Sequence, residues 1–227
     1  TAALYANTTA AYNTAVGSEA LVANTTGANN TAVGYNALAA NTTASPNTVI
    51  GANAGASNTT ATNMVAVGYG TLTANTTGVN NTAVGGHDCL SANVDGYDDT
   101  AIGDQSLQRN TSGYKNTAIG SDALIYNTVG FQNTSIGYAA GYSLTTGDNN
   151  IFVGIESGYT GSPGGNITTE DGQLCMGDEN IANAHIQVDW TVASDKRDKT
   201  DVSPLDLGLD FINQLEPVTY RWDKRSK

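Results

Sequence analysis

The chain has 227 residues, and nearly half of them are of four small types: 25 Asn, 31 Thr, 30 Ala and 26 Gly. Only 13% of the residues are charged, whereas an ordinary globular domain carries about 25% charged residues and fills its core with larger side chains. The composition therefore argues against a conventional α/β or helical enzyme. It leaves either a disordered low-complexity chain or a repetitive fold with a thin core.

The net charge of −12 belongs wholly to residues 1–194, which hold 14 acidic and 2 basic residues, while residues 195–227 hold 7 of each. Nucleic acids and anionic membranes select for Lys and Arg, so neither is an expected partner. The chain has no run of 18 apolar residues, so we expect no membrane insertion. Without a Met or a signal-like stretch at Thr1, the chain is expected to be a piece of a longer protein.

A motif of the form Asn-Thr-Ala-Val-Gly recurs nine times along the first two thirds of the chain. A 17-residue period separates successive motif glycines, with a single 18-residue interval between Gly85 and Gly103. These glycines are Gly17, Gly34, Gly51, Gly68, Gly85, Gly103, Gly120, Gly137 and Gly154. A disordered chain does not keep such a register, so the repetitive fold is favoured.

The repeat predicts one short strand per coil. The residue before each motif glycine is Val or Ile, which favours a strand, and the residue two positions earlier, Thr in seven copies, shares its face. A second apolar column, Leu in six copies and Gly in three, and an Asn column follow. We predict an all-β fold, a β-solenoid of nine 17-residue coils with parallel strands about 4.8 Å apart and stacked Asn amides at the turns.

Each coil offers only two large apolar side chains, so the core of a single rod would be thin. We expect the Val and Thr columns to face that core, with Thr partly inside. The Ala column would then face outward as a packing surface against other copies, which predicts a homotrimeric fibre. The alternative is a monomeric solenoid with Ala at tight corners.

Several residues of the rod are candidate sites. His87, Asp88 and Cys89 could hold a metal, but an extra residue in the turn explains them better, so no metal or cofactor is predicted. Cys89 and Cys175 lie too many coils apart for a disulfide.

Carbohydrate cleavage would need two carboxylates in a cleft. The candidates lie near the end of the rod, and solvated turns explain them more simply: Asp148, Glu156, Glu170 and Asp171. Five tyrosines of the rod could stack on sugars as adhesion contacts or pack between chains: Tyr35, Tyr69, Tyr138, Tyr142 and Tyr159.

Beyond the rod, the pattern changes. Alternating apolar residues over 186–192 predict a strand. Ser203-Pro204 supplies a helix start, Glu216-Pro217 ends that helix, and residues 218–222 are expected to form a strand, which gives a short α+β C-terminal segment.

The repeat resembles the head repeats of trimeric bacterial adhesins and, more closely, repeat regions of bacteriophage tail fibres. Residues 194–222 contain Ser-Asp-x-Arg-x-Lys, a helix and Leu-x-Pro-Val-x-Tyr-x-Trp. This order is similar to the opening of the intramolecular chaperone domain of phage tailspikes and fibres, the chaperone of endosialidase (peptidase family S74).

The resemblance implies that the chaperone assembles a trimer and then cuts itself off between Ser194 and Asp195. It also implies a Ser–Lys dyad, with Ser194 as nucleophile and Lys199 as base. A nearby positive charge such as Arg197 favours the neutral, basic form of a lysine. The alternative is that Ser194 and Lys199 are ordinary residues of a polar linker.

Together these observations predict the distal part of a phage tail fibre or spike, located in the virion. Residues 1–160 would form the shaft, 161–194 a β-rich distal tip, and 195–227 the N-terminal part of the chaperone. Expected partners are further copies of the chain, other tail-fibre components and a glycan or protein receptor on the host surface. Autoproteolysis is the only catalytic activity expected. The alternatives are a bacterial trimeric surface adhesin, a polysaccharide depolymerase and an ice-binding solenoid.

Overall fold

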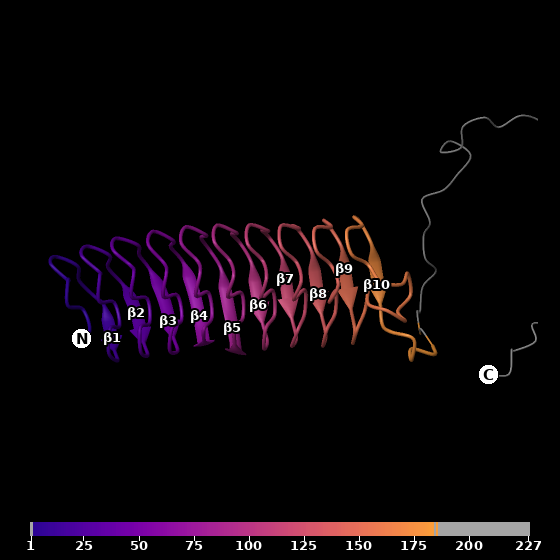
Figure 1. Ribbon diagram of the computed structural model, residues 1–227, viewed down its shortest axis with the longest axis horizontal. Helices are drawn as coiled ribbons and strands as arrows, with labels where there is room; N and C mark the ends of the chain where they lie inside the picture. The colour runs from indigo at the N-terminus through magenta and orange to yellow at the C-terminus, as the bar shows by residue number, and fades with distance from the viewer. Residues whose placement is uncertain (1, 184, 186–227) are drawn as a thin grey trace, which may run out of the picture. The chain divides into compact units, whose positions relative to one another are not determined.

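The computed structural model describes residues 2–183 and 185, and these residues form a β-solenoid without a helix (Figure 1). The chain divides into a unit of residues 1–183 and a unit of residues 184–227, and the solenoid is the first. Within the described part of the chain there is accordingly no helix of the length and hydropathy that a membrane span requires. The predicted fold class, an all-β parallel solenoid with a 17-residue repeat, is confirmed.

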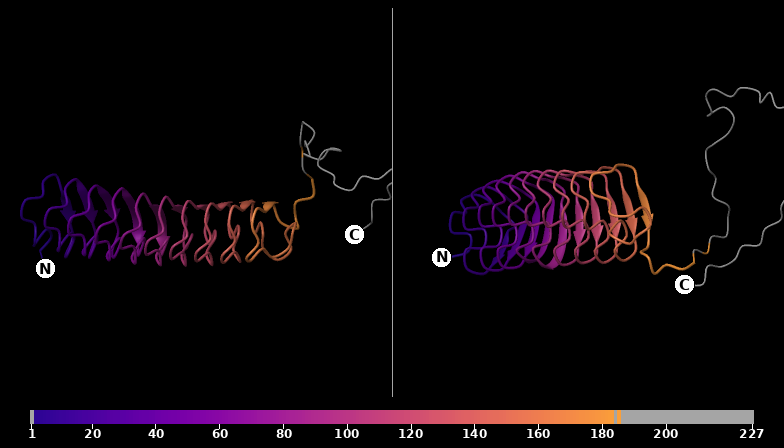
Figure 2. Two further views of the ribbon diagram at one scale, coloured as in Figure 1. Left: turned by 90° about the horizontal axis from the view of Figure 1, so that it is seen from above. Right: turned by 45° about the vertical axis from the view of Figure 1, so that its right-hand side comes forward.

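Ten short strands form one sheet in which spatial order follows chain order. The strands are β1 (Thr14–Val16), β2 (Asn30–Val33), β3 (Asn47–Ile50), β4 (Met64–Tyr69), β5 (Thr82–His87), β6 (Thr100–Ile102), β7 (Thr117–Ile119), β8 (Thr134–Ile136), β9 (Ile151–Val153) and β10 (Leu174–Met176). All neighbours pair in parallel, with equivalent residues of successive coils opposite one another, as in Ala15↔Ala32. The views of Figure 2 show the coils stacked one on the next along the rod.

One irregularity interrupts the ladder. The extra residue at Gly86 shifts the register between β4 and β5, so that Tyr69 pairs with His87. The predicted 18-residue coil is therefore real, and it appears as a bulge that leaves the following strands in step.

The tenth strand is not predicted by the repeat. β10 pairs with β9, for example Cys175 with Phe152, but the chain between them is longer than the 17-residue period. The additional residues form a loop around Gly161–Gly165, and the strand sequence Leu-Cys-Met departs from the repeat. The sheet thus continues into the segment that the sequence assigned to the distal tip.

The prediction of which strand face points inward is wrong. The small column is buried: Ala32, Ala66, Ala83, Ala101 and Ala118 have no exposed surface. The Val and Ile column faces outward, with Val16 57% and Ile136 42% exposed. The reason is steric, because the Leu of the next segment already fills the narrow interior of the coil and leaves room for little more than a methyl group.

The core is filled by complementary sizes within a coil and between neighbouring coils. In the coil of Phe152 the Leu column holds Gly158, where a Cβ would lie 2.3 Å from Phe152 Cε1. At Gly55 a Cβ would lie 2.9 Å from Cε of Met64, which belongs to the next coil. This column has a left-handed backbone throughout, with φ of 51° at Leu21 and 76° at Gly158. Leucine adopts this conformation at a cost of about 1–2 kcal/mol, which burial of its side chain offsets.

The motif glycines are required by close stacking of the coils. A Cβ at Gly51 would lie 2.2 Å from the carbonyl oxygen of Gly68, and φ at Gly51 is +143°. The same contact recurs from coil to coil. Any side chain here would hold two coils apart, so the glycine of the motif sets the pitch of the rod.

The predicted stacking of Asn amides is confirmed. Asn41 Nδ2 donates to Asn24 Oδ1 at 2.8 Å and to Ala44 O at 3.2 Å. This pattern repeats along the column except at Asn75, whose Nδ2 contacts Met64 Sδ instead of the preceding Asn. The members of the column are Asn24, Asn41, Asn58, Asn75, Asn93, Asn110 and Asn127. Their side chains are completely buried, so the ladder ties successive coils together inside the rod.

Candidate functional site

The predicted cleavage site falls outside the described residues. This applies to Ser194, Asp195, Arg197 and Lys199, and also to the strand, helix and strand expected over residues 186–222. The assignment of nucleophile and base therefore stays a prediction from the sequence. The remaining candidates lie on the solenoid.

His87, Asp88 and Cys89 do not converge on a common point. The His87 ring stacks on Tyr69 at 5.3 Å, and its Nδ1 lies 3.1 Å from Asp88 Oδ2. Cys89 points into the core, where its Sγ lies 3.3 Å from Ser106 Oγ, and burial raises its pKa to about 11. No group of three or more metal-ligating side chains occurs in the described residues.

The two cysteines in the described region are free and buried. Cys89 follows β5, whereas Cys175 lies in β10, five strands further along the sheet. Burial also raises the pKa of Cys175. Both thiols therefore serve as core side chains instead of nucleophiles.

The four carboxylates considered for sugar cleavage do not form a catalytic pair. Asp148 accepts the amide hydrogen of Phe131 at 2.9 Å, and Asp171 accepts that of Asp148 at 2.8 Å. Glu170 Oε2 caps the amides of Thr168 and Thr169. These hydrogen bonds lower the pKa of Glu170.

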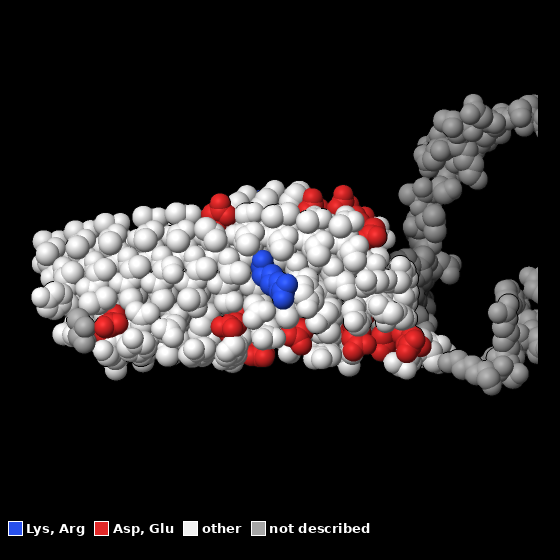
Figure 3. Space-filling model, viewed as in Figure 1, with Lys and Arg blue, Asp and Glu red and all other residues white. Residues whose placement is uncertain are grey.

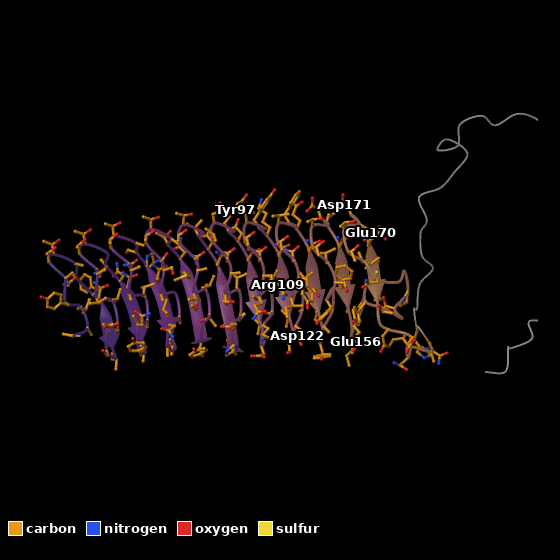
Figure 4. The ribbon with its side chains drawn as sticks, in the orientation of Figure 1. Tyr97, Arg109, Asp122, Glu156, Glu170 and Asp171 are labelled. Carbon is orange, nitrogen blue, oxygen red and sulfur yellow. The ribbon has the colours of Figure 1, made fainter. Side chains whose placement is uncertain are left out.

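The remaining carboxylate lies elsewhere. In Figure 4, Glu156 lies on the opposite long edge of the rod from Glu170 and Asp171. Asp148, Glu170 and Asp171 therefore organise turns, in agreement with the simpler interpretation of the sequence.

Aromatic side chains form two short ladders along the rod. Tyr97, Tyr114 and Phe131 stack with centroids 4.8 Å apart and ring planes within 6° of parallel. Each inner ring face is covered by a neighbouring ring, which leaves mainly edges for a ligand. This stack was not predicted from the sequence, although its members recur with the 17-residue period of the coils.

The second ladder contains two of the predicted tyrosines. Tyr142 contacts Tyr126 and Tyr159 edge to face at 5.0 and 5.1 Å, and Arg109 lies 4.5 Å above the Tyr126 ring. These contacts use the rings for packing within one chain. Tyr35 and Tyr138 are exposed, and so is Tyr69 at the end of β4, although one face of its ring stacks on His87.

The outward side chains of β1–β10 form a continuous surface, which we call the strand face. It carries no Asp, Glu, Lys or Arg, because none occurs in any of the ten strands. The carboxylates visible in Figure 3 gather along the two long edges of the rod. The strand face consists of Thr14, Val16, Thr31, Val33, Thr48, Ile50, Val65, Val67, Thr82, Val84, Thr100, Ile102, Thr117, Ile119, Thr134, Ile136, Ile151, Val153, Leu174 and Met176.

One buried acid interrupts a second amide ladder. In the column at the start of the strands, Asp99 replaces Asn and is fully buried. Its Oδ1 accepts the backbone N–H of Asn116 at 2.8 Å, and its Oδ2 accepts a hydrogen from the side-chain Nδ2 of Asn110 at 3.2 Å. Burial raises the pKa of Asp99 to about 7. The column consists of Asn13, Asn30, Asn47, Met64, Asn81, Asp99, Asn116, Asn133 and Asn150.

Comparison with known proteins bears on the C-terminal end. Residues 194–227 match the family described as chaperone of endosialidase, which agrees with the resemblance seen in the sequence. No curated protein and no solved structure gives a significant match to the chain. The match begins at the serine predicted to precede the cleaved bond.

Proposed function

We propose that the chain is the distal shaft of a trimeric phage tail fibre or spike, joined to the start of a self-cleaving chaperone. One observation supports this most strongly: a β-solenoid rod is followed, in the same chain, by a match to the chaperone of endosialidase. In the virion, the shaft would associate with other tail-fibre components and contact a glycan or protein receptor of the host.

The physics of a repetitive rod explains why a chaperone is useful. Successive coils are nearly equivalent, so a folding chain or a set of chains can pair one coil out of register at little energetic cost. A C-terminal domain that holds the ends of several chains together would set the register before the coils stack. Removing that domain afterwards would make the assembled state kinetically stable.

The proposed cleavage is hydrolysis of the peptide bond between Ser194 and Asp195. In this step Ser194 Oγ forms an ester bond with the carbonyl carbon of the Ser194–Asp195 peptide bond, and a neutral Lys199 accepts the hydroxyl proton. Lys199 passes that proton to the Asp195 nitrogen as the peptide bond breaks. Water then hydrolyses the ester, which leaves a carboxyl group on Ser194 and restores its hydroxyl.

Intact mass under denaturing conditions tests this proposal. The complete gene product should yield a fragment ending at Ser194, and Ser194→Ala and Lys199→Ala should remain uncut. Ser203→Ala changes a neighbouring serine and should be cut like the wild type. Uncut wild-type protein would refute the proposed self-cleavage.

One observation favours a second candidate, an ice-binding solenoid. Such a protein needs a flat array of outward Thr, and the Thr of the repeat does lie on the outward strand face. The sequence argument that Thr points partly inside therefore fails. Ice binding gives no account of the match at residues 194–227. A freezing-point hysteresis measurement on the purified chain decides whether this activity exists.

A further inference from the structure

We propose that the strand face is the surface through which copies of this chain associate. This inference rests on the proposed function, because it names the contact that would build the fibre. The face is uncharged over all ten strands, and its Val, Ile, Leu and Met side chains are exposed or half-buried in the single chain. An apolar surface of this length is unusual on a protein that remains a monomer.

The charge distribution favours a second copy as the occupant. Residues 1–194 carry 14 acidic and 2 basic side chains, so two rods repel each other wherever their carboxylates meet. The segment after the strands carries Arg109, Asp122 and Glu156, and the opposite edge carries Glu170 and Asp171 (Figure 4). Contact through the strand face keeps the carboxylates of both copies at the solvated edges.

The area of the face sets which residues must take part. Nine spacings of about 4.8 Å give a length of about 43 Å, and two outward columns are about 10 Å wide with their side chains. Two such surfaces bury only about 860 Å², less than the about 1,200 Å² of a stable interface.

A third outward column corrects this shortfall. It consists of the residues that follow the motif glycines and includes the exposed Tyr35, Tyr69, Tyr138 and Ile155. The exposed Asp104 also belongs to this column, so the outer margin of the column must stay solvated. This column raises the buried area of a pair to about 1,400 Å². We therefore place these tyrosines at the rim of the contact between copies.

The bulge at Gly86 gives the contact a unique alignment. A uniform ladder could slide by one coil, about 4.8 Å, and meet the same side chains again. The pairing of Tyr69 with His87 occurs once along the rod, so copies fit best when their bulges lie at the same height. Parallel copies in register satisfy this condition.

Two charged substitutions test the face. Ile119→Asp combined with Ile136→Asp adds a carboxylate to two neighbouring coils, at positions 37% and 42% exposed in the single chain. Val129→Asp is the matched control, because Val129 is 46% exposed on a different side of the coil and Asp95 stands at the equivalent position of an earlier coil. Light scattering gives the mass, and far-ultraviolet circular dichroism checks the fold.

The wild-type chain should be a multiple of 23.3 kDa, and so should Val129→Asp. The double variant should keep its β spectrum while its association weakens at least about a hundredfold, because buried carboxylates would lack partners. An unchanged mass of a folded double variant would overturn the strand face but leave the proposed fibre function standing.

A wild-type monomer would overturn both the contact and the trimer. If that monomer also showed freezing-point hysteresis, the strand face would belong to ice. Failure of the cleavage experiment alone would leave the association through the strand face intact, so the two proposals can be separated.

Discussion

Replacing Asp99 with Asn should stabilise the solenoid above about pH 5. Asn in this column donates its amide to a turn carbonyl of the same coil, as Asn116 Nδ2 does to Gly130 O at 2.9 Å. The ionised Asp99 has no hydrogen for the equivalent carbonyl, that of Gly113. The Asn side chain would supply one, while its oxygen continues to accept the backbone N–H of Asn116. The hydrogen bond that Asp99 Oδ2 accepts from Asn110 Nδ2 is lost in exchange.

The magnitude follows from the pKa. Burial raises the pKa of Asp99 from 3.8 to about 7, which corresponds to about 4 kcal/mol at 1.36 kcal/mol per pH unit. The pKa of Asp99 is higher in the folded state than in the unfolded state. The stability that the protonated carboxyl contributes is therefore fully present below about pH 4, and it is lost as the pH rises through about 7. For a unit of this size, 4 kcal/mol corresponds to a melting temperature change of roughly 8–16 °C.

Thermal melts followed by circular dichroism at pH 4 and pH 8 provide the assay. The melting temperatures of wild type and Asp99→Asn should differ little at pH 4 and by roughly 8–16 °C at pH 8. Asp95→Asn, which changes an exposed acid of the same coil, should follow the wild type at both values. Equal wild-type and Asp99→Asn melting temperatures at pH 8 would refute the reasoning.

Three further predictions concern the packing of the coils. Phe152→Ala should lower the unfolding free energy by about 3–5 kcal/mol. Adding Gly158→Leu should recover part of this loss, because an Ala and Leu pair fills most other coils. Denaturant melts of the single and the double variant measure both effects. Asn93→Ala should cost about 1–3 kcal/mol for each buried partner left unpaired, seen in the same melts. Gly103→Ala should lower the unfolding free energy by about 1–3 kcal/mol or more, since its Cβ would lie 2.5 Å from the Gly120 carbonyl. Gly172→Ala is the control and should cost less, because no atom lies within 4 Å of its Cβ. A larger loss at Gly172 than at Gly103 would contradict the stacking role of the motif glycines.

The sequence predicts the fold well because the repeat is strict. A 17-residue spacing of β-branched residues and glycines admits stacked parallel coils and little else. The amide ladder follows from the same spacing. β10 escaped prediction because the loop inserted after β9 places it outside this period.

The facing of the strands could not be read from alternation alone. Alternation says that Ala and Val point to opposite sides, but not which side is inside. The answer depends on the space left by Leu21 and its equivalents across the coil, which is a tertiary property. The exposed strand face, and with it the surface proposed for association, was therefore visible only in the structure.

The candidate site residues also divide into those that a sequence motif identifies and those that only the structure reveals. Ser194 and Lys199 were identified by a motif, and the match at residues 194–227 supports the family assignment of that segment. Asp99 carries no motif, and only its burial distinguishes it from the exposed Asp98.

Native mass spectrometry of the mature complete gene product tests the central claim most directly, because it reports copy number and chain ends together. We expect an assembly of three copies, each of which ends at Ser194 when released from the complex. A single chain, or copies that still carry residues 195–227, would contradict the account of a trimeric shaft freed by its own chaperone.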